Sequence, residues 1–143
     1  MWFEDLSPCT YFPIDANVIA VGWLDRDHPY ATGPVDRAVY ERLVQFRVKP
    51  WQPLVLMGVH PCALCQFAPE AHSAANLFIP GEDAIFVCPE LITHYINAHH
   101  YAPPEPFRRA VLACPPMGSM PYLQALASRG GSRLLRSTTD RHP

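Results

Sequence analysis

Two short stretches of the chain carry side chains that are typical metal ligands. The first covers residues 60–65, with the sequence HPCALC, and the second is the histidine-containing run 89–100. Zinc prefers four ligands in a tetrahedron, and a Cys-x-x-Cys turn supplies two thiolates because the chain can wrap around the ion. Histidines spaced by four residues are common in Cys2His2 sites. The sequence therefore predicts a zinc site made of Cys62, Cys65, His94 and His99.

The histidine pair does not fit an ideal helix. Five residues rotate an α-helix by about 500°, so the side chains of His94 and His99 would point about 140° apart. Both can reach one ion only if the last turn tightens or unwinds near Ala98. Otherwise another group completes the site. The alternates are His60, beside the cysteine turn, and Cys88, at the start of the predicted helix, where the helix end helps to lower a thiol pKa.

Catalytic zinc is a weaker interpretation than structural zinc. Nucleobase deaminases share the Pro-Cys-x-x-Cys half of the motif but also need an upstream His-x-Glu, which neither His28 nor His60 begins. Another zinc hydrolase would need three protein ligands, an open position for water and a nearby acid or base. Glu90, one turn before His94, is the candidate for that role. A small zinc-dependent hydrolase is therefore the first alternative.

A thiol redox protein that uses the Cys62–Cys65 pair without metal is the second alternative. A thioredoxin-like pair would begin a helix after a strand, but residues 66–69 (QFAP) allow only a short helix. We therefore favour a non-enzymatic protein with a structural zinc site. Its role would then be to bind another protein.

Short elements separated by prolines predict a small α+β domain. The predicted strands cover 10–12, 17–24 and 54–57, followed by a hairpin over 76–79 and 84–87. Three to four short helices are predicted, over 35–47, 89–99, 104–113 and 121–128. The order of cysteine knuckle, hairpin and ligand-bearing helix over 58–100 is similar to that of treble-clef zinc folds.

Composition excludes several protein classes. The chain has 143 residues, 17% of them charged, and a formal net charge of −2. No apolar run approaches the roughly 20 residues that span a bilayer, so no membrane partner is predicted. Neither the net charge nor any motif indicates a general nucleic-acid binder. Five cysteines without a signal-peptide pattern at residues 1–5 predict a reducing, cytoplasmic compartment.

The last fifteen residues differ from the rest. Residues 129–143 contain four arginines against one aspartate and are rich in Gly, Ser and Thr. We therefore predict a single domain over 1–128 and a flexible basic tail over 129–143. Weak contacts of this tail with nucleic acid are the only such contacts expected.

Several motifs resemble those of a family of small, uncharacterised bacterial proteins. They include MWFEDL at 1–6, HPCALC at 60–65, PELITHYINAH at 89–99 and YAPP at 101–104. The resemblance extends over most of the chain to about residue 128. It implies no substrate and no catalytic residue, but it supports treating this body as one domain.

Overall fold

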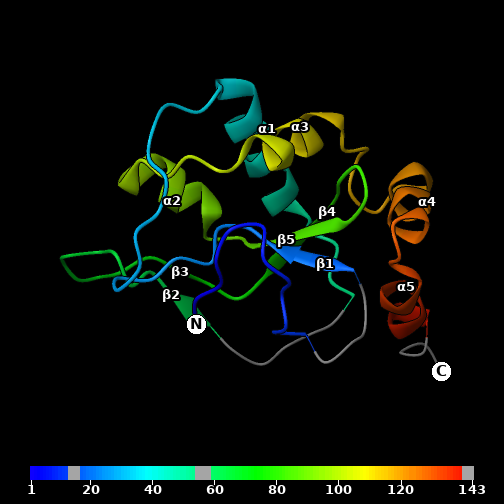
Figure 1. The fold of residues 1–143 in the computed structure, drawn as a ribbon, viewed down its shortest axis with the longest axis horizontal. Coiled ribbons are helices and arrows are strands. Elements are labelled where there is room, and N and C mark those ends of the chain that lie inside the picture. Colours follow the sequence, from blue (N-terminus) through cyan, green and yellow to red (C-terminus); the bar gives the residue numbers. More distant parts are fainter. Residues whose placement is uncertain (13–16, 54–58, 140–143) are drawn as a thin grey trace.

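The computed structural model describes residues 1–12, 17–53 and 59–139, and these form a small α+β fold (Figure 1). Five helices and two small sheets make up the described part of the chain. In Figure 1, α4 and α5 lie at one end, and α2 lies at the other with the β2–β3 pair. The elements are β1 (Val18–Ala20), α1 (Arg37–Val48), β2 (His60–Pro61), β3 (His72–Ser73), β4 (Asn76–Pro80), β5 (Ile85–Pro89), α2 (Ile92–His99), α3 (Glu105–Ala113), α4 (Met120–Ser128) and α5 (Ser132–Thr139).

The main sheet has the order β1-β5-β4, with β5 parallel to β1 and antiparallel to β4. Every residue of β4 and β5 is buried, which explains their apolar sequences NLFIP and IFVCP. The predicted hairpin is therefore confirmed. Its turn needs Gly81, because a Cβ there would lie 2.6 Å from the Phe86 ring.

Helix faces follow the predicted periodicity. Val39, Leu43 and Phe46 form the buried face of α1, and α3 packs against α1. At α4, the Ser119 side chain accepts a hydrogen bond from the Tyr122 backbone N–H and so caps the N-terminus of the helix. The four predicted helices are all present, with shifted ends.

Several local expectations are wrong. Residues 10–12 are not a strand, since residues 11 and 12 form a bend. Strand β1 is shorter than predicted because Gly22 adopts a φ of 77°. Helix α2 begins at Ile92 because β5 continues through Pro89. Residues 60–61 and 72–73, which lie outside the predicted strands, form the antiparallel β2–β3 pair. The predicted strand at 54–57 lies outside the described residues.

The C-terminal part of the described chain contains one more helix. Helix α5 covers part of the segment 129–143, and Leu134 within it is fully buried. Gly130, with a φ of 88°, allows the chain to turn after α4. Leu134 belongs to the hydrophobic core cluster, so α5 packs against the rest of the fold.

Candidate metal centre

The Cys-x-x-Cys turn follows directly on β2. The backbone N–H of Cys62 donates to Ala71 across the β2–β3 pair, at 2.7 Å. Arg26 reaches the same turn from a distant loop, since its Nε donates to the Ala63 carbonyl at 3.0 Å and its Nη2 to the Cys65 carbonyl at 3.5 Å. The turn is therefore attached to Ala71, just before β3, and to Arg26. Cys62 is buried and Cys65 half-buried.

The end of α2 is widened, and this places both histidines on one side. The backbone N–H groups of His100 and Tyr101 both donate to the Tyr95 carbonyl, five and six residues back, instead of to a carbonyl four residues back. A wider turn contains more residues, so a five-residue separation is little more than one turn. The sequence predicts that this turn must tighten or unwind for His94 and His99 to meet, and the hydrogen bonds show a turn wider than that of an ideal α-helix.

The four predicted ligands come together in space. Their donor atoms all lie within 4.8 Å of one another, and the group is Cys62, Cys65, His94 and His99. The two Nε2 atoms are 3.2 Å apart, Cys65 Sγ lies 3.3 Å from His94 Nε2, and Cys62 Sγ lies 3.4 Å from His99 Nε2. Cys65 Sγ lies 3.8 Å from His99 Nε2.

These distances between donor atoms fit tetrahedral coordination of one ion. With zinc bonds of about 2.05 Å to nitrogen and about 2.3 Å to sulfur, tetrahedral angles place two nitrogens ~3.3 Å apart and a nitrogen and a sulfur ~3.6 Å apart. The observed pairs scatter around those values. Two soft thiols and two imidazoles also match the donor types that zinc selects. The residues present therefore fit a bound zinc ion.

Burial controls the protonation of the group. It lowers the pKa of both His94 and His99, which favours the neutral imidazole that a metal requires. It raises the pKa of the Cys62 thiol, while backbone N–H groups of Leu64 and Cys65 act in the opposite direction. The same N–H groups would stabilise a metal-bound thiolate. Metal binding at neutral pH would release thiol protons.

The two alternates belong elsewhere in the fold. The ring of His60 packs on Trp23, with centroids 5.1 Å apart, and on Tyr11. Cys88 is fully buried on β5, where burial raises the pKa of its thiol. Neither residue is part of the four-ligand group.

Glu90, the candidate acid or base, forms an ion pair with Arg47. Its Oε1 lies 3.7 Å from Nη2 of Arg47, and Arg47 also donates to the Thr93 hydroxyl at 2.8 Å. These contacts join α1 to the start of α2. Arg47 thus holds the Glu90 side chain in place.

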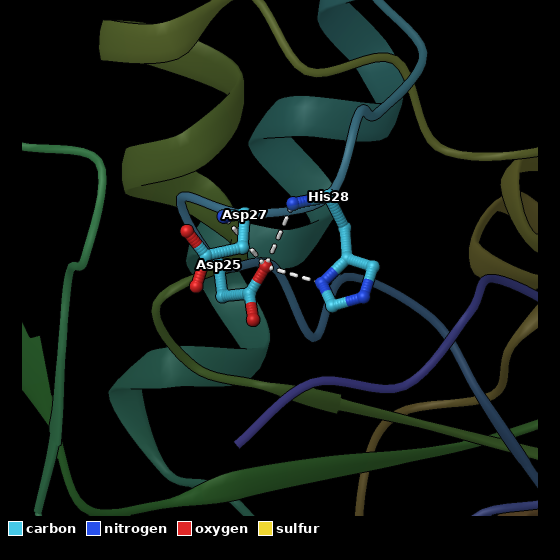
Figure 2. Close-up of polar contacts among 3 residues, drawn as sticks. All are labelled: Asp25, Asp27 and His28. Atoms are coloured by element: carbon cyan, nitrogen blue, oxygen red, sulfur yellow. Dashed lines mark hydrogen bonds and ion pairs between the residues drawn. The ribbon is translucent and has the colours of Figure 1, made fainter.

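Arg26 is a contributor that the sequence analysis missed. It lies in a turn fixed by Asp25, whose Oδ1 accepts hydrogen bonds from the backbone N–H groups of Asp27 and His28, both at 3.1 Å (Figure 2). His28 Nδ1 lies 2.8 Å from the same oxygen, and this contact lowers the pKa of Asp25. The His28 ring also stacks on Trp2, with centroids 3.7 Å apart. Only the turn-forming Asp25 signals this arrangement in the sequence.

Comparison with protein families gives one match. Residues 1–112 match the model of a domain of unknown function, DUF7919. Searches of curated proteins and of solved structures gave no match. Within the described ranges, none of the helices combines the length and the apolar character needed to cross a membrane.

Proposed function

The chain belongs to the DUF7919 family, whose function is unknown, and we propose that it is a zinc-binding protein whose metal site is structural. One observation carries the proposal: four donor atoms, two from the cysteine turn after β2 and two from α2, lie within 4.8 Å of one another. Two thiolates and two imidazoles complete a tetrahedral shell, which leaves no position for a substrate or a reactive water. The ion would then link the Cys62–Cys65 turn to α2.

A protein-binding role is the second part of the proposal. Phe67, two residues after Cys65, is 83% exposed, and Val59, just before β2, is 59% exposed. Exposed apolar side chains on a loop held by a metal are well placed to contact a partner. The metal would contribute by fixing the loop that presents them. The cysteine ligands are consistent with a reducing compartment, such as the cytoplasm.

Metal content is the direct test. We expect one zinc per chain in protein purified without added metal, and loss of that zinc together with a lower melting temperature in Cys62→Ser. Cys88→Ala is the matched control: it removes another buried cysteine, so it costs stability but should keep the metal. Wild-type protein that lacks metal and melts unchanged after chelation would contradict the proposal.

The coordination shell separates the alternatives. X-ray absorption should give two sulfur and two nitrogen ligands for a structural site. Three protein ligands and one oxygen would favour a zinc hydrolase instead. A Cys62–Cys65 disulfide in metal-free protein that reduces small disulfides would favour the thiol redox function.

A further inference from the structure

A cavity of about 590 Å³ lies away from the metal group, between the β4–β5 turn, α3 and the end of α4. Figure 1 shows that turn beside α3 and α4. The volume falls within the range of about 300–1,000 Å³ typical of small-molecule sites. None of the four predicted metal ligands lines the cavity. It is therefore a separate feature of the molecule.

Part of the cavity wall is apolar, and this part is made largely of small residues. Ala110, Ala113 and Ala125 come from the two helices, and the ring of Phe86 comes from β5. Gly81 closes the turn, and a Cβ there would press against the Phe86 ring at 2.6 Å. Small side chains leave the space open, and the aromatic ring offers a surface for an apolar group.

Charges of both signs surround this apolar wall. Arg109 and Arg129 line the helix side, and Glu82 and Asp83 line the turn. In the parts of the chain that are described, none of the four makes an ion pair. Guanidinium and carboxylate groups that line one cavity fit a ligand that carries both charges.

Arg129 is already held in position. Its Nε donates to the Gly81 carbonyl, and its Nη1 donates to the Ala125 carbonyl at 3.0 Å and to the Ser128 hydroxyl at 2.7 Å. No hydrogen bond of Nη2 is found among the described residues, so this nitrogen can donate to a ligand. A fixed guanidinium loses little side-chain freedom when it binds an anion, which favours recognition of a carboxylate.

We propose that this cavity binds a small zwitterion with an apolar body, of the class of free amino acids and dipeptides. The ligand carboxylate would pair with Arg109 and Arg129, and its ammonium with Glu82 and Asp83. An apolar side chain would cover Phe86. The proposal does not depend on the metal site, so either can fail alone.

Calorimetric titration of the full chain with leucyl-leucine tests the proposal. We expect saturable binding that weakens at least tenfold when the ammonium is acetylated or the carboxylate is amidated, because each cap removes one charge-assisted contact. Arg109→Gln should weaken binding of leucyl-leucine by about tenfold, and Ala113→Leu should abolish it by filling the cavity. Arg37→Gln, on the exposed surface of α1, is the control and should leave binding unchanged.

Three results would overturn the proposal. They are the absence of binding by leucyl-leucine at millimolar concentration, equal binding of the capped and free dipeptides, and equal affinities for Arg109→Gln and Arg37→Gln. Both arginines are exposed, so neither substitution should alter the circular dichroism spectrum or the metal content. A loss of affinity then reports on the cavity and not on the fold.

Discussion

At the scale of single residues, the metal group depends on contacts outside the four ligands. Arg26 donates to two carbonyls of the cysteine turn, although it is 36 or more residues away in sequence. Tyr30 donates to the carbonyl of His99 at 3.1 Å, so the other half of the site also has an outside support. Partners of this kind orient ligands and affect metal affinity without touching the ion.

Substituting Arg26 should weaken the site without removing it. We expect Arg26→Gln to lower zinc affinity by up to about tenfold, because the cysteine turn loses two hydrogen bonds while keeping both thiolates. Competition with a chromophoric chelator measures the change. Arg37→Gln serves again as an exposed control. Equal affinities for the two variants would show that Arg26 does not support the turn.

His60 should make folding stability depend on pH. Burial lowers the pKa of His60 from its ordinary 6.5, so the unfolded chain takes up the proton first as the pH falls. Stability that depends on the neutral ring is present above about pH 6.5 and is lost as the pH falls below it.

The measurement is the free energy of unfolding by urea between pH 7.5 and 5, with the metal state matched. We expect a flatter dependence on pH in His60→Phe than in the wild-type chain, since His94 and His99 titrate in both proteins. An unchanged slope would show that His60 is not protonated preferentially in the unfolded chain.

At the scale of elements, the decisive feature is the widened end of α2. His100 adopts a left-handed conformation, with a φ of 57°, where the helix stops. That residue directs the chain onward to Tyr101, which is fully buried and donates to Asp5 at 2.8 Å. The helix end thus links the metal group to the core.

Residue 100 should tolerate glycine but not valine. We expect His100→Val to lower the free energy of unfolding by about 1–2 kcal/mol, because a β-branched residue is strained at positive φ. His100→Gly should be neutral or stabilising. Urea unfolding of both variants checks this, with zinc content as a second measurement. Equal stability of the two variants would contradict the conformation described for the helix end.

At the scale of the whole molecule, the C-terminal helices complete the fold beyond the matched domain. Tyr122 on α4 is fully buried, and its hydroxyl donates to the Phe78 carbonyl at 2.5 Å. Leu134 on α5 is also fully buried. These contacts argue that residues after 112 are part of the same folded body.

Leu134→Ala tests whether α5 packs as described. We expect a loss of about 2–4 kcal/mol in the free energy of unfolding, as for other buried leucines. Leu112→Ala is the matched control, because Leu112 is 51% exposed, and it should cost under about 1 kcal/mol. If both variants lost similarly little free energy of unfolding, Leu134 would not be packed in the core. The prediction of a flexible tail over 129–143 would then be favoured.

The sequence by itself determined the local features of this protein. Two apolar segments separated by a short turn predicted the β4–β5 hairpin, and apolar residues at helical spacing predicted α1 and α3, because these patterns depend on near neighbours. The types and spacing of Cys62, Cys65, His94 and His99 likewise predicted a metal group.

Only the tertiary structure decided which of these residues meet. The widening of α2, the contact of Arg26 with the cysteine turn and the separation of His60 and Cys88 from the group all depend on long-range packing. The same is true of the packing of α5, through the buried Leu134, and of the cavity beside Phe86. Such arrangements depend on contacts between residues distant in sequence, which propensity and periodicity do not specify.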